Sequence, residues 1–279
     1  MTSNGRPMPL LDVDGLRHVY GSGPGAHLAI ENLDFEVRDG EFVSIVGPSG
    51  AGKTTLLKCT SGLMAPSAGQ VSLAGEVHDG VPDDLALVFQ DYKSSLFPWM
   101  TVTGNVDFPL GQRGLDRDER RTRIEESLAA VDLSTYGDFY PWQLSGGMQQ
   151  RVAIARALAY RPKVLLMDEP FASVDAQTRA ELEDLVLAVR DRFDMTVLFV
   201  THDIDESVYL SDRILVLSKS PATIIASIDV PLPKPRDQID TRERDDFVHL
   251  RAEIARLIRR AGEGYRGEDA RVPAGSEGG

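Results

Sequence analysis

A glycine-rich stretch that ends in Lys-Thr-Thr is the first feature of this 279-residue sequence that could do chemistry. The segment "GPSGAGKTT" matches the pattern G-x-x-x-x-G-K-[ST] from Gly47 to Thr54. Its glycines let successive backbone N–H groups point at phosphate oxygens, Lys53 adds a positive charge for the β and γ phosphates, and Thr54 can ligate Mg²⁺. The pattern predicts a nucleotide phosphate site formed by Gly47, Pro48, Ser49, Gly50, Ala51, Gly52, Lys53, Thr54 and Thr55.

An acidic pair at the end of an apolar run could complete a hydrolytic site. The segment "VLLMDEP" places Asp168 and Glu169 at the C-terminal end of a predicted strand, where the ligands of parallel sheets gather. Asp168 can hold Mg²⁺ through water, and Glu169 can orient or deprotonate an attacking water. Taken alone, the pair would more often lie solvated on the surface, but the phosphate loop favours the hydrolytic interpretation.

The elements around these residues predict an α/β fold with a mainly parallel sheet. Apolar runs at "FVSIV", "LALVFQ", "KVLLMDEP" and "MTVLFVTHD" are typical of buried strands. Segments 10–20 and 28–37 alternate like half-buried strands, and we expect Asp39-Gly40 to lead into "EFVSIVG" as a hairpin turn. Residues 69–79 are expected to form a further strand. From about 91 to 160 the pattern becomes helical and charged, which indicates an insertion.

Helical patterns return in the C-terminal part. One helix carries Leu182, Leu185, Val186 and Val189 on one stripe, and the last carries Phe247, Leu250, Ile254 and Leu257. Between them, Asp203 followed by Glu206 predicts a helix that starts with a capping box. We expect one domain over residues 9–261 and a disordered tail, rich in Gly, Glu and Ser, over 262–279.

Composition narrows the function classes. The formal net charge is −13, which argues against broad nucleic-acid binding and against a polybasic membrane anchor. Cys59 is the only cysteine, so a disulfide framework is not possible and a reducing compartment fits. No apolar run approaches the roughly 20 residues that span a bilayer, and the N-terminus lacks the pattern of a signal peptide. We therefore expect a cytoplasmic protein.

The segment "QLSGGMQQR", residues 143–151, predicts a second anion site. Ser145 and two glycines open a predicted helix, and a helix start gathers free backbone N–H groups at the positive end of the helix dipole. A single phosphate tail cannot use both anion sites if they lie far apart in one subunit.

Together these motifs resemble the ATP-binding subunits of ABC transporters, and "LSGGMQQR" is similar to the signature motif of that family. The resemblance covers nearly the whole chain. It implies a P-loop NTPase core with an N-terminal antiparallel β-subdomain and an α-helical subdomain inserted at about 91–160. The segments "VFQDYKSSLFPWMTVTGNVDFPL" and "DIDESVYLSDRILVLS" are most similar to importers of the nitrate, sulfonate and taurine group. The implied function is an ATPase that energises import of a small anion or organic solute.

The resemblance also implies roles for single residues. Tyr20 resembles the aromatic residue that stacks on adenine, Gln90 the Q-loop glutamine near Mg²⁺ and the attacking water, and His202 the switch histidine at the γ phosphate. The segment "ASVDA", which contains Asp175, resembles the D-loop. The implied cofactors are ATP and Mg²⁺. The metal set is Thr54, Gln90 and Asp168, and the catalytic set is Glu169, His202, Gln90 and Lys53.

A head-to-tail homodimer with two ATP molecules between its subunits is implied as well. Ser145, Gly146 and Gly147 of one chain would complete the γ-phosphate contacts of the ATP that the other chain holds. ATP would close the dimer and hydrolysis would open it, which makes a mechanical switch. Transport would need separate transmembrane permease subunits docked at "SSLFPWM" and an extracytoplasmic substrate-binding protein. The chain would then lie at the cytoplasmic face of the membrane.

Two alternatives stay open on the sequence. A P-loop small-molecule kinase would explain the phosphate loop but neither "LSGGMQQR" nor His202. A non-transport ABC ATPase would act in DNA repair or translation. Only about fifty residues separate Gln90 from Leu144, without the long coiled coils of chromosome-type members, and translation-type members usually carry two cassettes.

Overall fold

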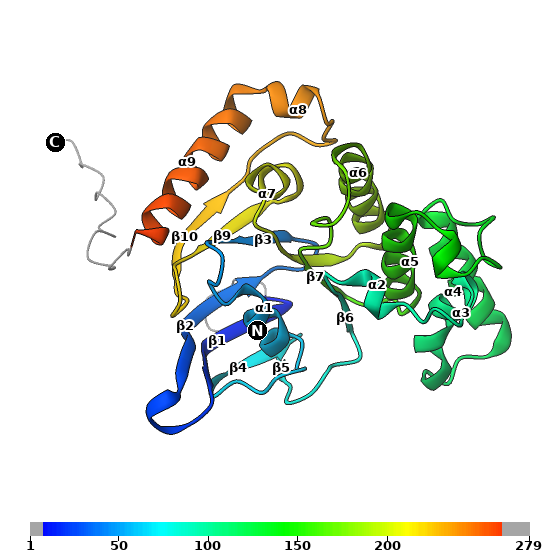
Figure 1. The fold of residues 1–279 in the computed structure, drawn as a ribbon, viewed down its shortest axis with the longest axis horizontal. Coiled ribbons are helices and arrows are strands. Elements are labelled where there is room, and N and C mark those ends of the chain that lie inside the picture. Colours follow the sequence, from blue (N-terminus) through cyan, green and yellow to red (C-terminus); the bar gives the residue numbers. More distant parts are fainter. Residues whose placement is uncertain (1–7, 264–279) are drawn as a thin grey trace.

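The structure is a computed structural model that describes residues 8–263. Its strands form two sheets, with helices packed on the larger one and a helical region to one side (Figure 1). The tail predicted for 262–279 lies outside the described residues from residue 264 onward. Within residues 8–263, none of the helices combines the length and the hydropathy that crossing a bilayer requires.

A four-stranded antiparallel sheet is built mostly from the N-terminal part of the chain. In spatial order its strands are β2 (His27–Val37), β1 (Leu11–Tyr20), β4 (Ala68–Leu73) and β5 (Glu76–Val77). The alternating segments predicted as strands are the paired strands β1 and β2. The strand expected over 69–79 is instead a tight hairpin, because Ala74 and Gly75 adopt φ values of 52° and 85° and reverse the chain.

The hairpin predicted at Asp39-Gly40 is wrong. A turn does occur there. However, β2 pairs with β1, whereas β3 (Phe42–Val46) pairs in the other sheet with β8 (Thr196–Val200) and β9 (Arg213–Leu217). Every residue of β3 is buried, while β2 is partly exposed. A strand that is apolar along its whole length suits the interior of a parallel sheet, so β3 joins that sheet.

A six-stranded sheet forms the centre of the molecule (Figure 1). Its spatial order is β10 (Ile224–Asp229), β9, β3, β8, β7 (Val164–Asp168) and β6 (Leu85–Val88). The pairs from β9 to β6 are parallel, and β10 runs antiparallel to β9. The parallel strands therefore end at the same edge of the sheet, and the expected α/β fold is confirmed.

Helices cover the large sheet and build the region beside it (Figure 1). The helices that pack on the sheet are α1 (Lys53–Thr60), α6 (Ala176–Phe193), α7 (Ile204–Leu210) and α9 (Asp245–Gly262), with α8 (Asp240–Glu243) leading into the last. The side region contains α2 (Tyr92–Ser95), α3 (Val102–Asp107), α4 (Arg117–Ala130) and α5 (Gly146–Ala159). Short 3-10 turns are η1 (Gly23–Gly25), η2 (Phe108–Gln112) and η3 (Pro141–Gln143).

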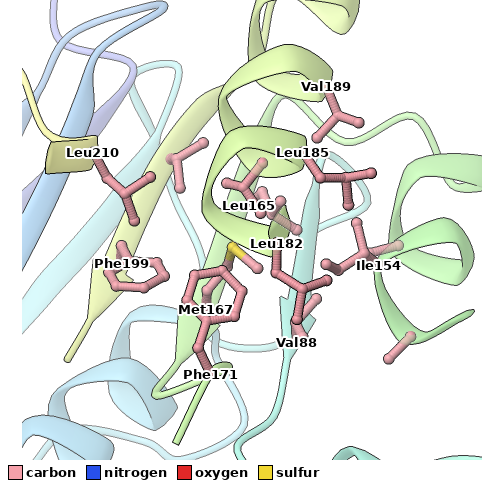
Figure 2. Close-up of a cluster of buried hydrophobic side chains, with 14 of the residues drawn as sticks. Val88, Ile154, Leu165, Met167, Phe171, Leu182, Leu185, Val189, Phe199 and Leu210 are labelled. Carbon is pink, nitrogen blue, oxygen red and sulfur yellow. The ribbon is translucent and has the colours of Figure 1, made fainter. Parts of the chain in front are cut away.

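The hydrophobic core divides between the two faces of the large sheet. In β7, Leu165 and Met167 pack in the cluster beneath α6, whereas Leu166 packs in the cluster that holds α1 and the small sheet. Figure 2 shows the first cluster, with Met167 and Phe199 of the sheet beside Leu182 of α6. Burial on both faces fixes the strand ends, which carry the polar residues of the site. The predicted stripe on α6 is buried, namely Leu182, Leu185, Val186 and Val189.

The start of α7 differs from the predicted capping box. Asp203 does cap the helix, because its Oδ1 accepts from the backbone N–H groups of Asp205 and Glu206 at 2.9 and 3.2 Å. The second half of the box is wrong. The carboxylate of Glu206 accepts a hydrogen bond from the hydroxyl of Thr201 at 2.6 Å instead of turning back to the cap.

Candidate active site

Neighbouring strands of the large sheet bring the predicted site residues to one edge. The strands β3, β8, β7 and β6 lie side by side and run parallel. The phosphate loop comes after β3, His202 after β8, Glu169 after β7, and Gln90 after β6. The strand before His202, β8, pairs directly with β7, which ends at Asp168. Parallel topology thus gathers four segments that are far apart in the chain.

The phosphate loop wraps around the side chain of Lys53. The ammonium of Lys53 donates to the carbonyl oxygens of Gly47 and Pro48 at 3.1 and 3.3 Å. Burial lowers the pKa of Lys53, and the nearby carboxylates of Glu169 and Asp168 oppose that shift. Gly52 has a φ of 83°, a conformation that L side chains rarely adopt. The backbone of the loop therefore surrounds the ammonium group of Lys53 and binds it through carbonyl oxygens.

Glu169 is the point at which the catalytic candidates meet. Its Oε2 accepts from the Gln90 amide at 3.3 Å and lies 2.9 Å from Nδ1 of His202, while its Oε1 lies 3.9 Å from Nζ of Lys53. The residue has a φ of 42°, which is uncommon outside glycine and is a feature of functional sites. Its backbone N–H is held by the carbonyl of Val200 at 2.8 Å. The sheet thus fixes the direction in which the carboxylate points.

Asp168 and Thr54 form a second polar pair beside this cluster. The Thr54 hydroxyl donates to Oδ1 of Asp168 at 3.4 Å. Burial raises the pKa of Asp168, and the Thr54 hydrogen bond works against that shift. Adjacent ligands on an octahedral Mg²⁺ ion lie about 3 Å apart, and this ion prefers one or two carboxylates beside phosphate oxygens. The two oxygens therefore fit a Mg²⁺ site. Gln90 contacts Glu169 rather than this pair.

A pocket of about 600 Å³ opens above the phosphate loop. Three of the residues that line it are not predicted by the sequence patterns. His27 lies opposite Tyr20 because β1 and β2 pair there, so the strand pattern could have indicated it. Ala29 lies two residues after His27 in β2, so the same strand pattern could have indicated it. Ser220 reaches the pocket only through the packing of a distant segment, which no local pattern indicates. The full lining is Tyr20, His27, Ala29, Ser49, Gly50, Ala51, Gly52, Lys53, Thr54, Thr55, Glu169, His202 and Ser220.

Tyr20 stands at the rim of this pocket. Its side chain is 40% exposed, and its ring meets His18 edge-on at 4.6 Å between centroids. Its hydroxyl lies 3.0 Å from Oγ1 of Thr55, the residue after the phosphate-loop threonine. The ring is therefore tethered at one end and open to a planar ligand on the remaining surface.

The start of α5 lies apart from the pocket. Ser145 is exposed and caps the helix, accepting from the backbone N–H of Met148 at 3.3 Å. Gly147 is buried, and a Cβ at this position would lie 2.4 Å from Cγ2 of Thr178 in α6. Asp175 caps α6 by accepting from the N–H and hydroxyl of Thr178 at 3.0 and 2.7 Å, and these bonds lower its pKa. Ser145, Gly146, Gly147 and Asp175 are all absent from the pocket lining.

Comparison with known proteins identifies the group to which this arrangement belongs. Residues 30–172 match the ABC transporter family. An uncharacterized ABC transporter ATP-binding protein of Methanocaldococcus jannaschii, MJ0412, is 43% identical and aligns over 89% of this chain and 91% of its own length. The nitrate transport protein NasD of Klebsiella oxytoca is 39% identical, with 90% and 96% covered. The bicarbonate transport ATP-binding protein CmpC of Synechococcus elongatus is 44% identical over 84% of this chain, which spans only 35% of that longer protein.

Two solved structures are similar in fold and sequence. A dimeric structure of the ATP-binding cassette MJ0796 in a post-hydrolysis state, bound to ADP and Pi, has a TM-score of 0.68 and 33% identity, with 79% of this chain and 98% of that chain covered. The structure of cbiO1 from Clostridium perfringens, part of the ABC transporter complex cbiONQ, has a TM-score of 0.74 and 27% sequence identity. The match covers 92% of this chain and 99% of that chain. The kinase alternative is thereby set aside. The chain belongs to the ABC transporter family and is one of its P-loop ATPases.

Proposed function

We propose that two copies of this chain close around two ATP molecules and that hydrolysis powers a membrane importer for a small solute. One observation carries the proposal. Lys53, Gln90 and His202 converge on Glu169 beside one pocket, while the helix start at Ser145 lies outside that pocket and exposed. A site that is only partly built in one chain is completed most simply by the helix start of a second chain.

The residues of one chain divide the work of hydrolysis. The phosphate loop and Lys53 bind the β and γ phosphates, and Glu169 orients the attacking water and takes its proton. His202 and Gln90 hold the carboxylate of Glu169 in place and reach toward the γ phosphate and the water. Tyr20 stacks on adenine at the rim. Mg²⁺, held by Thr54 and Asp168 with Gln90 nearby, would neutralise charge on the phosphates.

Ser145, Gly146 and Gly147 act on the nucleotide of the partner subunit. The helix start, at which Ser145 is exposed and Gly146 half-buried, would offer backbone N–H groups and the positive end of the dipole of α5 to a γ phosphate. Asp175 lies at the same surface, because Gly147 packs against Thr178, which Asp175 binds. The γ phosphate bridges both chains, so its loss on hydrolysis lets the dimer open.

The transported solute is a small anion such as nitrate, or a small organic solute such as a sulfonate or taurine. One relative is named for nitrate transport and another for bicarbonate transport. Nitrate and bicarbonate are both small monovalent anions. The solute site belongs to an extracytoplasmic binding protein and to separate permease subunits. This chain works at the cytoplasmic face of the membrane and does not bind nucleic acid.

The permease subunits dock on the segment that precedes α3. Trp99 is 70% exposed, and its ring contacts that of Phe97, which in turn contacts exposed Phe108. Exposed aromatic clusters are typical anchors of protein interfaces. Changing Phe97 and Trp99 to Ser should reduce co-purification with the permease and leave ATP binding intact. Val77→Ser, at an exposed apolar residue of β5, is the matched control. Normal co-purification of the double variant would remove this docking site.

The dimer is tested most simply by slowing hydrolysis. Glu169→Gln keeps the size of the side chain but removes the base, so turnover should fall at least about 10²-fold while ATP still binds. The variant should then accumulate as an ATP-bound dimer in sizing chromatography with Mg-ATP, and as a monomer with ADP. A monomer at every protein concentration under ATP would contradict the proposal.

A further inference from the structure

His202 lies between Thr201 and Asp203, and hydrogen bonds hold both of these neighbours in place. The hydroxyl of Thr201 accepts from the backbone N–H of Asp203 at 2.9 Å and donates to Oε2 of Glu206 at 2.6 Å. These two bonds fix the backbone on both sides of His202. The imidazole itself is 62% exposed, so little packing holds it. Its position depends mainly on its bond to Glu169 and on the residues that flank it.

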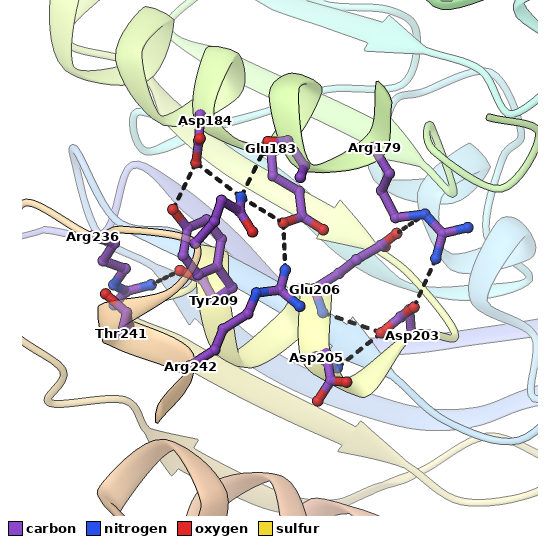
Figure 3. A network of polar contacts seen from close by, with 12 residues as sticks. Arg179, Glu183, Asp184, Asp203, Asp205, Glu206, Tyr209, Arg236, Thr241 and Arg242 are labelled. Atoms are coloured by element: carbon purple, nitrogen blue, oxygen red, sulfur yellow. Dashed lines mark hydrogen bonds and ion pairs between the residues drawn. The ribbon is translucent and has the colours of Figure 1, made fainter. Parts of the chain in front are cut away.

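Arg179 of α6 joins the same frame from the side. Its guanidinium donates to Oδ2 of Asp203 at 3.0 Å and forms an ion pair with Glu206 at 3.5 Å. Figure 3 shows Arg179 reaching both carboxylates from the neighbouring helix. The backbone N–H of Arg179 donates to the carbonyl of Asp175, so the arginine lies one turn from the start of α6. The frame therefore connects the segment after His202 to the helix that begins at Asp175.

The burial of the Glu206 carboxylate costs folding free energy, which suggests that the residue serves a function. Its side chain is 4% exposed, and a buried carboxylate costs free energy unless it is well paired. Burial raises its pKa to about 7, and Thr201 and Arg179 only partly oppose that rise. The charged groups that face or neighbour it are Arg179 and Glu183 from α6, Asp203 and Asp205 at the start of its own helix, and Arg242 from α8, which binds Glu183.

We propose that Glu206, acting through the Thr201 hydroxyl and together with Arg179, is a positioning residue for His202. This inference rests on the proposed role of His202 in hydrolysis. Glu206 does not line the pocket above the phosphate loop, so we assign it a positioning role and not a catalytic one. It sets the conformation of the short segment that carries the histidine, and Arg179 ties that segment to the α6 start, which we place at the dimer interface. A displacement of α6 when two chains meet would thus be felt at His202.

The matched control is Glu183, which lies one turn after Arg179 in α6 and belongs to the neighbouring part of the same network (Figure 3). It is 1% exposed and forms an ion pair with Arg242 at 2.6 Å, so its removal disturbs a comparable buried pair. Within residues 8–263, no hydrogen bond links Glu183 to Thr201, His202 or Asp203. Glu206→Ala and Glu183→Ala should therefore lose similar thermal stability but differ in catalysis.

The experiment measures kcat and KM for ATP in Glu206→Ala, Arg179→Ala, Glu183→Ala and His202→Ala, with melting temperatures alongside. Glu206→Ala and Arg179→Ala should lower kcat by about 10- to 100-fold with KM changed little, because misplacement of a catalytic group affects the chemical step. Glu183→Ala should keep kcat near that of the parent. If His202→Ala keeps full turnover, the proposed role of His202 fails and this inference fails with it. If only His202→Ala loses turnover, this inference alone is overturned.

A second measurement covers the case in which Glu206→Ala does not fold. Glu206→Gln keeps an oxygen that can accept from Thr201 but cannot ionise. Ionised Glu206 is the stronger acceptor and the partner of Arg179, so the ratio of parent to Glu206→Gln turnover should rise as pH increases through about 7. Taking the ratio cancels titrations common to both proteins. A ratio that stays flat from about pH 6 to 8 would overturn the proposal.

Discussion

The pocket above the phosphate loop and the helix start at Ser145 are both suited to phosphate, but they are built differently. At the pocket and directly beside it, side chains from segments that follow four strands already contact one another around Glu169. At Ser145, the start of α5 is exposed and is capped by the serine hydroxyl, which accepts from the backbone N–H of Met148. The first region is organised by the sheet of its own chain, whereas Ser145 in the second region does not line that pocket.

This difference supports the proposal that the two predicted anion sites act on a nucleotide held between two chains. Gly147 packs so closely on Thr178 that an added Cβ would clash with the threonine methyl group, which places the starts of α5 and α6 in direct contact. Rigid support of an exposed anion site is useful when the anion arrives on another molecule, because preorganised donors need not rearrange on contact. In each proposed composite site, the pocket of one chain binds the ATP, and we call it the receiving half. The α5 start of the other chain contacts the γ phosphate, and we call it the delivering half.

The largest effect should come from breaking the receiving half. Lys53→Ala removes the buried ammonium at the centre of the loop, so kcat/KM for ATP should fall by about 10³- to 10⁵-fold. Both binding and turnover should suffer, as measured by nucleotide titration and steady-state hydrolysis. Lys58→Ala, a partly exposed lysine later in α1, is the control and should change little. Near-normal turnover of Lys53→Ala would refute the central role of the loop.

A smaller effect should come from loosening the support of the delivering half. Gly147→Ala places a Cβ 2.4 Å from Cγ2 of Thr178, so the free energy of unfolding should fall by about 1–3 kcal/mol. Thr178→Ser removes that methyl group and keeps the hydroxyl that binds Asp175. In the Thr178→Ser background the same Gly147→Ala change should cost clearly less in denaturant titrations. An equal cost in both backgrounds would mean that the contact does not limit how α5 packs.

Much of the receiving half could be predicted from local patterns. The apolar runs before Gly47, Asp168 and His202 identify buried strands, and parallel strands bring the residues at their C-terminal ends to one edge of the sheet.

The hairpin expected at Asp39-Gly40 is wrong because turn residues specify a bend and not the partner of the next strand. The spacing of Glu206 from Asp203 fits a capping box, whereas the bond that Glu206 makes to Thr201 depends on tertiary packing.

The pocket lining shows where such patterns end. Ser220 lies beyond the end of β9, and it borders the phosphate loop only because β9 is the parallel neighbour of β3. The separation of Ser145 from the pocket likewise depends on where α5 packs and not on the motif itself. The positions of Ser220 and Ser145 depend on the order of the strands and on the packing of the helices. The spacing of motifs along the sequence does not reveal either.

Complementation between two inactive variants tests whether each ATP site is shared between two chains. Lys53→Ala breaks only the receiving half, and Ser145→Arg puts a bulky side chain on the exposed delivering half while leaving the pocket of its own chain intact. Each variant alone should be nearly inactive, and Ser145→Arg should still bind ATP. In a mixed dimer, one site combines both defects and the other is whole.

If the ATP sites are shared between chains, activity should return when the two variants are mixed. Random exchange makes about half of the dimers mixed, so about a quarter of all sites should be intact by counting. Subunit exchange is verified independently with labelled chains, and a tandem-linked dimer with one defective site establishes whether a single good site turns over. If that linked dimer is active and the exchanged mixture stays at zero, Ser145 serves the ATP of its own chain and the split-site account is contradicted.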